Sequence, residues 1–242
     1  MAGGGALPTL VGMPRTLGTL DGRDFAAVLF DMDGTLIDSI PVVVRSWLRW
    51  AQEEGVDPER LVGFHGVPAR GIAATLLPPE RVDAAVDRIE AIETADTDGI
   101  TILPGTVQAL ATLTAAGAER RDLCAIATSC TRPLATARIE ATGLPAPRVV
   151  VTASDVAQGK PHPDPFLLAA ELLGVDPREC LVVEDAPGGL EAARAAGCST
   201  LAVTTTTAPA DLIADAVVGT LGDVRFSVVG GRVRVTGVDA DA

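Results

Sequence analysis

Short runs of apolar residues alternate with amphipathic segments along much of this chain. The run at 25–30 predicts a buried strand, and further apolar strands are predicted at 123–128, 149–152, 181–184 and 201–204. Apolar positions at helical spacing predict helices over 107–116, 133–142, 164–173 and 190–196. Strands that are apolar throughout and alternate with helices are typical of a parallel sheet that helices cover on both faces. The pattern therefore predicts an α/β fold.

The segment 40–103 interrupts this alternation. Helical spacing recurs over 42–55, 67–77 and 80–95, and no strand-like run lies among these helices. Pro78 and Pro79 separate the last two helices. We therefore expect a helical domain over 40–103, inserted into an α/β core that comprises 25–39 and 104–242.

The two ends of the chain carry weaker signals. Residues 1–24 are rich in Gly, Leu and Thr and lack the long apolar segment of a signal peptide, so we expect a disordered lead-in there. Near the C-terminus, the segments 225–229 and 232–238 flank Gly230-Gly231 and predict a β-hairpin. We expect this hairpin to add an antiparallel edge to the sheet.

Composition and charge narrow the classes of partner. The 242 residues carry a formal net charge of −13 and only 3% aromatic residues, which argues against nucleic-acid binding. No stretch of about 18 apolar residues occurs, so we expect no membrane partner. The four cysteines lack the spacing of metal or redox sites and are interpreted as reduced core residues. We therefore expect a cytoplasmic protein, with a monomer as the simplest oligomeric state.

Two carboxylates follow directly after the first predicted strand, in the sequence Asp31-Met32-Asp33-Gly34-Thr35-Leu36. Burying two like charges side by side is costly unless a cation or a proton offsets them. Gly34 allows a sharp turn and a close approach of the backbone to a ligand. The segment therefore indicates a metal site, acid–base chemistry or both.

Chemically active side chains also follow the other predicted strands. Thr128-Ser129 ends the second strand, Lys160 follows the third, and Glu184-Asp185 ends the fourth. Because ligands of parallel α/β sheets gather at the carboxyl ends of the strands, we expect these groups to converge. Lys160 is the only lysine among 19 Lys and Arg residues, which indicates a position that needs a compact point charge rather than a planar guanidinium.

These four elements, in this order, resemble the four sequence motifs of the haloacid dehalogenase-like phosphotransferases. The resemblance covers about residues 25–207 and is tightest over 126–207. Within that range, Ala127-Thr128-Ser129, the segment 151–163 and the segment 183–189 look like the branch that contains sugar-phosphate phosphatases, glycerol-phosphate phosphatases and β-phosphoglucomutase. The resemblance implies a Rossmann-like parallel sheet core with a small helical cap over 40–103.

The resemblance also implies the catalytic and metal-binding roles. Asp31 would be the nucleophile that accepts the phosphoryl group, and Asp33 would be the general acid and then the general base. A Mg²⁺ cofactor would be held by oxygen ligands from Asp31, Asp33, Glu184 and Asp185. Asp33 would contribute its backbone carbonyl to the metal, and Glu184 would support it directly or through its neighbours.

Phosphate and substrate binding are implied in the same way. Thr128 and Ser129 would hold phosphate oxygens, and Lys160 would balance the negative charge of Asp31 and the phosphate. His65 and Arg70 lie in the inserted helices, where this family keeps cap residues that contact the substrate. They are the candidates for that contact.

The resulting hypothesis is a Mg²⁺-dependent phosphatase whose partner is a small phosphorylated metabolite, either a sugar or a polyol. A β-phosphoglucomutase-like phosphomutase is the alternative, because it shares all four motifs and differs in its cap contacts. Asp33 argues against a dehalogenase, which has no use for a second acid. The absence of lysine from 40–103 argues against a phosphonatase, which needs a cap lysine. The intact acids and Lys160 argue against a binding module without catalysis.

Overall fold

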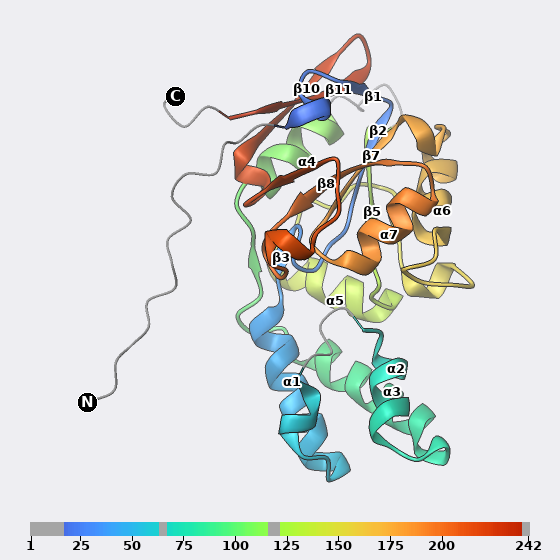
Figure 1. Cartoon of the computed structure of the whole chain (residues 1–242). Helices are drawn as coiled ribbons and strands as arrows, with labels where there is room; N and C mark the ends of the chain where they lie inside the picture. The colour runs from blue at the N-terminus through green and yellow to red at the C-terminus, as the bar shows by residue number, and fades with distance from the viewer. Residues whose placement is uncertain (1–16, 63–66, 116–121, 239–242) are drawn as a thin grey trace.

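The computed structural model describes residues 17–62, 67–115 and 122–238 of the chain. Within these residues a six-stranded parallel sheet forms the centre of the molecule, in the order β6-β5-β2-β7-β8-β9 (Figure 1). Its strands are β6 (Val150–Val151), β5 (Cys124–Ala127), β2 (Ala27–Phe30), β7 (Cys180–Glu184), β8 (Ser199–Val203) and β9 (Ala216–Val218). The expected α/β fold with a parallel sheet is therefore confirmed.

Successive strand residues point to opposite sides of the sheet, and in β2 both sets are apolar and buried. Helices therefore cover both faces of the sheet. In β2, Leu29 belongs to the hydrophobic cluster that contains Phe166 of α6, whereas Phe30 belongs to the cluster that contains Leu110 of α4. The core helices in the described residues are α4 (Thr106–Ala115), α5 (Arg132–Thr142), α6 (Asp164–Leu173) and α7 (Pro187–Ala195). Each overlaps the helix that the sequence predicts at that place.

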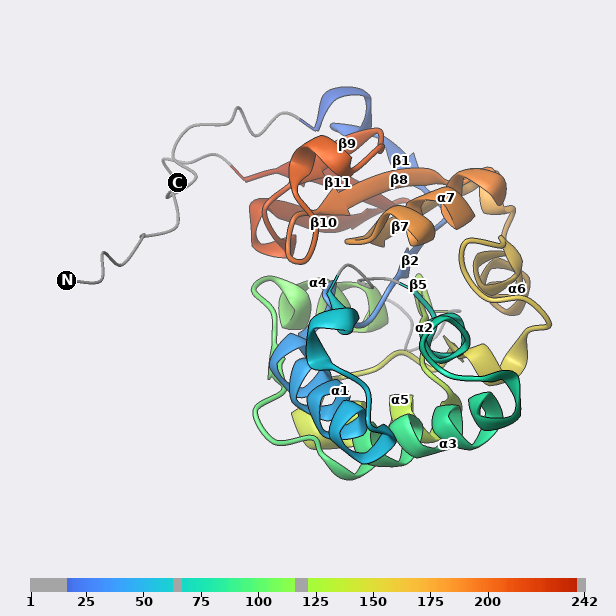
Figure 2. The same ribbon diagram turned by 60° about the horizontal axis from the view of Figure 1, so that its bottom comes forward.

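Three further helices, α1 (Ile40–Glu54), α2 (Ala69–Leu76) and α3 (Pro79–Ala95), follow β2 in the chain. They pack around a hydrophobic cluster of their own, which includes Trp50, Ala73 and Ile89. β3 (Ile37–Asp38) and β4 (Thr101–Ile102) pair antiparallel where the chain enters and leaves this segment. We call residues 40–103 the helical insertion; its α3 packs next to α5 of the core (Figure 2).

The C-terminal hairpin does not extend the main sheet, contrary to the prediction. β10 (Val224–Val229) and β11 (Arg232–Gly237) join β1 (Asp24–Phe25) in a separate three-stranded sheet, in the order β1-β11-β10. Phe226 of β10 meets Phe30 of β2 edge to face, with ring centroids 5.9 Å apart. The hairpin therefore covers one face of the main sheet. The edge of that sheet next to β8 is the short strand β9, which the sequence pattern did not predict.

Part of the expected lead-in belongs to the core, which corrects that prediction for residues 17–24. Gly18–Leu20 form a short 3-10 helix, and Leu17 and Leu20 are buried in the hydrophobic cluster that contains Phe30. Residues 1–16 lie outside the described part of the chain. Other 3-10 turns occur at Pro58–Leu61, Ala153–Asp155, Pro177–Glu179, Pro209–Asp211 and Leu221–Asp223. In the described part, no helix has the length and hydrophobicity needed to cross a membrane.

Candidate active site

Three neighbouring strands of the sheet end at the candidate site. Asp31 follows β2, Thr128 follows β5 and Glu184 is the last residue of β7. Because β5 and β7 flank β2 and run parallel to it, their carboxyl ends share one edge of the sheet. Lys160 reaches this edge from the loop after β6: its Nζ lies 2.5 Å from Oδ1 of Asp31 and 2.8 Å from Oε1 of Glu184. The fold thus brings together groups that are far apart in the chain.

The ion pair between Lys160 and Asp31 is buried, since neither side chain is more than 8% exposed. Burial raises the pKa of Asp31 to about 7; attraction to Lys160 opposes this shift, and repulsion from Glu184 adds to it. Burial by itself would lower the pKa of Lys160, but the attraction of Asp31 and Glu184 outweighs it and keeps that pKa above its usual value. The ammonium group is therefore charged, but its single positive charge does not balance the carboxylates around it.

Three carboxylates converge beside Lys160. Asp31, Glu184 and Asp185 are all buried, and each offers one oxygen within 4.8 Å of the others. Burial, followed by repulsion from Glu184 and Asp31, raises the pKa of Asp185 well above its usual value. One ammonium cannot neutralise three carboxylates, and an all-oxygen donor set is the set that Mg²⁺ prefers. The residues present therefore fit a divalent cation.

Neighbouring groups hold two of these acids in place. Oε2 of Glu184 accepts hydrogen bonds from the backbone N–H groups of Asp185 and Ala186, at 2.8 and 2.7 Å. The carboxylate of Asp185 accepts hydrogen bonds from the hydroxyls of Thr35, at 3.3 Å, and Thr206. Sequence reasoning missed Thr206, which lies beyond the end of β8 and carries no motif of its own.

Two glycines allow the acids to sit this close to the backbone. Gly34 has φ of +85°, and a Cβ there would overlap the side chain of Asp185. Gly189, in the first turn of α7, lies so close to Glu184 that a Cβ would overlap its carboxylate. The neighbouring Gly188 has open space at the same point. The site therefore depends on glycine at 34 and 189 but not at 188.

The remaining residues that the sequence singled out lie in different surroundings. Thr128 is buried and its Oγ1 accepts a hydrogen bond from the N–H of Cys130 at 3.1 Å, while Ser129 is exposed beside it. Arg70 lies on α2 with a side chain 63% exposed, and its Nη1 is 2.7 Å from Oδ1 of Asp83 on α3. No described polar contact joins Arg70 to the acids. His65 lies outside the described residues.

Asp33 is held by a set of groups that the sequence did not predict. Ser39 donates a hydrogen bond to its Oδ1 at 2.7 Å, and the thiol of Cys130 donates to its Oδ2 at 3.0 Å. Nη1 of Arg138 lies 2.8 Å from Oδ1 of Asp33, and Nη2 of Arg138 lies 3.3 Å from Oε1 of Glu93. Glu93 belongs to α3, so this set of contacts joins the core to the helical insertion.

The pattern of buried positions could have revealed Arg138 and Glu93. Arg138 lies four residues after Leu134 in α5, and Glu93 lies four residues after Ile89 in α3, so each charged residue shares a face with a buried apolar one. A charge on the buried face of a helix is unusual without a partner. That signal is independent of any family motif.

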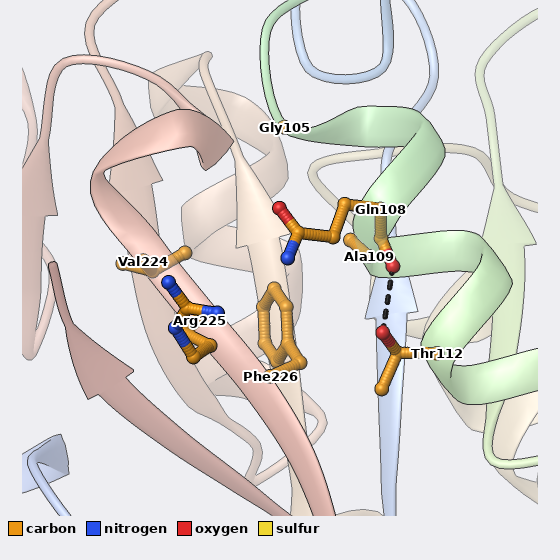
Figure 3. Close-up of a pocket in the computed structure, with 7 residues that line it drawn as sticks. All are labelled: Gly105, Gln108, Ala109, Thr112, Val224, Arg225 and Phe226. Atoms are coloured by element: carbon orange, nitrogen blue, oxygen red, sulfur yellow. Dashed lines mark hydrogen bonds between the residues drawn. The ribbon is translucent and has the colours of Figure 1, made fainter.

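The pocket between α4 and β10 is a separate feature (Figure 3). It is lined by Gln108, Thr112, Arg225 and Phe226 among others, and its volume is about 10 Å³. That volume holds about one water molecule. The pocket shares no residue with the acid cluster, so the strand ends remain the candidate site.

Comparison with known proteins gives consistent matches. The sequence model described as haloacid dehalogenase-like hydrolase matches residues 25–197. Hexitol phosphatase A of Escherichia coli (strain K12) is 47% identical over 187 residues, 76% of this chain and 83% of that protein. Glycerol-1-phosphate phosphohydrolase 2 of Saccharomyces cerevisiae is 35% identical over 190 residues, 74% of this chain and 75% of that protein. A solved structure of a proposed β-phosphoglucomutase from Thermotoga maritima aligns with a TM-score of 0.60 and 27% identity, over 81% of this chain and 95% of that one.

Proposed function

Because the chain belongs to the haloacid dehalogenase-like hydrolases, we propose that it is a magnesium-dependent phosphatase that hydrolyses a small phosphorylated sugar or polyol through an aspartyl-phosphate intermediate. The observation that carries this proposal is the position of Lys160, whose ammonium contacts both Asp31 and Glu184 beside a third buried acid. The relatives named for hexitol and glycerol-1-phosphate chemistry support a polyol or sugar ester as the substrate.

The first step is attack by Asp31 on the phosphorus atom of the ester. A bond forms between a carboxylate oxygen and phosphorus, and the bond from phosphorus to the alcohol oxygen breaks. Lys160 stabilises Asp31 as the carboxylate, which is the nucleophilic form, and its charge also offsets that of the phosphoryl oxygens. Because the pair is buried, this electrostatic effect is stronger than it would be in water.

Asp33 then handles the protons of both steps. As a general acid it gives a proton to the departing alkoxide, which leaves as the alcohol. In the second step Asp33 takes a proton from the attacking water, the bond between Asp31 and phosphorus breaks, and inorganic phosphate is released. Residue 33 lies two positions after the nucleophile, so both carboxyl groups come from the same strand end.

The metal and phosphate sites complete the proposal. Asp31, Glu184 and Asp185 would hold Mg²⁺, together with the backbone carbonyl of Asp33. When bound, Mg²⁺ supplies positive charge for the oxygens of the transferring phosphoryl group. Thr128 and Ser129 would donate hydrogen bonds to that group. On the helical insertion, Arg70 and His65 are our candidates for contacts that select the alcohol part of the substrate.

A sugar phosphomutase is the second candidate function, favoured by the match to the Thermotoga maritima protein. In that reaction the phosphoryl group on Asp31 returns to a different hydroxyl of the sugar instead of passing to water. The core residues would act in the same way. What differs is whether water or the sugar meets the phosphorylated Asp31.

The proposal is tested by following a panel of hexitol, sugar, glycerol and nucleotide phosphates with phosphorus NMR, in Mg²⁺ and in EDTA. We expect Mg²⁺-dependent release of inorganic phosphate from hexitol or other polyol and sugar esters, and none with Asp31→Asn. Conversion of a sugar phosphate to its isomer without phosphate release would establish the mutase instead. Turnover that persists in EDTA or in Asp31→Asn would contradict the proposal.

A further inference from the structure

Arg138 is a buried cation that touches Asp33 directly. It lies on α5, its side chain is 4% exposed, and its Nη1 is 2.8 Å from Oδ1 of Asp33. The same nitrogen donates a hydrogen bond to the sulfur of Cys130 at 3.1 Å, and that thiol in turn donates to Oδ2 of Asp33. Both carboxylate oxygens of Asp33 are therefore held by a connected set of groups.

The second half of the guanidinium reaches the helical insertion. Nη2 of Arg138 lies 3.3 Å from Oε1 of Glu93, whose side chain is 11% exposed. A buried cation needs such partners, because removing it from water costs several kcal/mol that only good ion pairs offset. The planar guanidinium can hold two carboxylates in fixed directions, which a single ammonium cannot do as well. Glu93 thus fixes one side of Arg138, and Asp33 occupies the other.

A second contact between α3 and the core lies nearby. Oγ1 of Thr131 donates a hydrogen bond to Oε1 of Glu90 at 2.6 Å. Glu90 and Glu93 are three residues apart and so lie close together on α3. α3 is therefore tied to α5 by Thr131 at the N-cap of that helix and by Arg138 within it, and the contact through Arg138 continues to Asp33.

We propose that Arg138 is a positioning residue for Asp33, and that Glu93 makes this positioning depend on the helical insertion. Arg138 fixes the direction of the Asp33 carboxyl group, which must meet the alcohol oxygen when the bond to phosphorus breaks. The described polar contacts of the Arg138 side chain are with Asp33, Glu93 and Cys130, and Asp31 is not among them. This inference rests on the proposed function, in which Asp33 is the general acid.

A leaving-group comparison distinguishes this role from a purely structural one. An alkyl phosphate needs a proton on its departing oxygen, whereas p-nitrophenyl phosphate releases a stable phenolate and needs little help from a general acid. We therefore compare kcat/KM for a hexitol phosphate and for p-nitrophenyl phosphate, at saturating Mg²⁺, in the full-length protein. The ratio of the two values reports how well Asp33 delivers its proton.

Arg138→Lys keeps the charge but loses the second arm of the guanidinium. We expect it to lower kcat/KM for the hexitol phosphate by about tenfold to a hundredfold, because small misplacements of a catalytic group cost that much. The value for p-nitrophenyl phosphate should change by less than about threefold. Asp33→Asn should shift the ratio in the same direction and further. A fall of both values by the same factor in Arg138→Lys would overturn the inference.

Two other variants complete the test. Arg132→Lys, at the exposed start of the same helix, pairs with Asp155 rather than with Asp33 and should leave the ratio unchanged. Glu93→Gln removes the charge on the other side of Arg138 and should also lower the ratio of kcat/KM for the hexitol phosphate to that for p-nitrophenyl phosphate. An unchanged ratio in Glu93→Gln would overturn the part assigned to the helical insertion. If Arg138→Lys does not fold, Glu93→Gln carries the test. A wild-type protein that releases no phosphate from either ester would overturn the proposed function and this inference together, whereas an active wild type with an unchanged ratio in Arg138→Lys overturns this inference alone.

Discussion

The Nζ of Lys160 lies 2.5 Å from Oδ1 of Asp31, although 129 positions separate the two residues in the chain. This contact places the only lysine of the protein against the proposed nucleophile. Because the same ammonium also contacts Glu184, it is the positive charge within the cluster of Asp31, Glu184 and Asp185.

Replacing Lys160 with methionine should remove the charge while keeping most of the volume. We expect kcat/KM for the best substrate to fall by at least about a hundredfold, as for the loss of other groups that stabilise developing charge. Lys160→Arg restores a charge but puts a larger, planar group where the compact ammonium lies 2.5 and 2.8 Å from two buried carboxylate oxygens, so it should recover only part of the loss. Full activity in Lys160→Met would show that the contact has no catalytic role.

Replacing Asp185 with asparagine should change stability in opposite directions with and without metal. Burial and neighbouring acids raise the pKa of Asp185, so its ionised form destabilises the metal-free fold at neutral pH. In EDTA, Asp185→Asn should therefore melt at a higher temperature than the wild type. Mg²⁺ at about 100 times its Kd should stabilise the wild type by about 3 kcal/mol but the variant much less. Equal stabilisation of both proteins by Mg²⁺ would argue that Asp185 is not a ligand.

The paired glycines at 188 and 189 offer a matched comparison of single methyl groups. Gly189→Ala places a Cβ against the carboxylate of Glu184, so we expect weaker Mg²⁺ binding and a fall in kcat/KM of at least about tenfold. Gly188→Ala meets open space and removes a flexible residue from α7, so it should keep full activity and gain up to about 1 kcal/mol of stability. If the two variants behave alike, the close approach at Gly189 does not support the site.

Glu93 should make the stability of the protein depend on pH. Burial raises its pKa from 4.5 to about 7, opposed by attraction to Arg138 and increased by repulsion from Asp33 and Glu90. Between these two values the folded protein binds more protons at Glu93 than the unfolded chain does, so this residue lowers stability as pH rises from about 5 to 7. Relative to the wild type, Glu93→Gln should become more stable over that interval, by about 1 to 3 kcal/mol.

Urea unfolding of both proteins at pH 5 and at pH 7.5 measures this difference. The quantity to compare between pH 5 and pH 7.5 is the difference in free energy of unfolding between Glu93→Gln and the wild type. The direct effect of the substitution on packing is present at both pH values and cancels in that comparison. A difference that is independent of pH would show that Glu93 ionises normally in the folded protein.

The sequence predicted the fold class and the groups at the strand ends because both depend on local pattern. Apolar strands ending in Asp31, Thr128 and Glu184 indicate a parallel sheet, and the carboxyl ends of its strands must share an edge. The hairpin predicted over 225–238 was placed wrongly because its own pattern fixes its turn but not its partner. Its partner is β1, which is two residues long and lies some 200 positions away in the chain.

The contacts of Asp33 were not predicted for a related reason. Arg138 is one of many arginines, and its helix has no motif that marks it. Whether such a residue faces solvent or a carboxylate depends on how α5 packs against α3, and α3 belongs to a segment with a separate hydrophobic cluster. The places of Arg138 and Glu93 on the apolar faces of their helices signal that each needs a partner, but which partner each one meets follows from the packing of the whole fold.

Transfer of the phosphoryl group from the substrate to Asp31 can be followed by mass spectrometry. Wild-type protein in Mg²⁺ is mixed with its best substrate, quenched in acid during turnover and digested for mass spectrometry, with a parallel sample reduced by borohydride. We expect one added phosphoryl group on Asp31, which is absent from Asp31→Asn, and homoserine at position 31 in the reduced sample. Turnover with Asp31 unmodified, or with the phosphoryl group on another residue, would contradict this expectation.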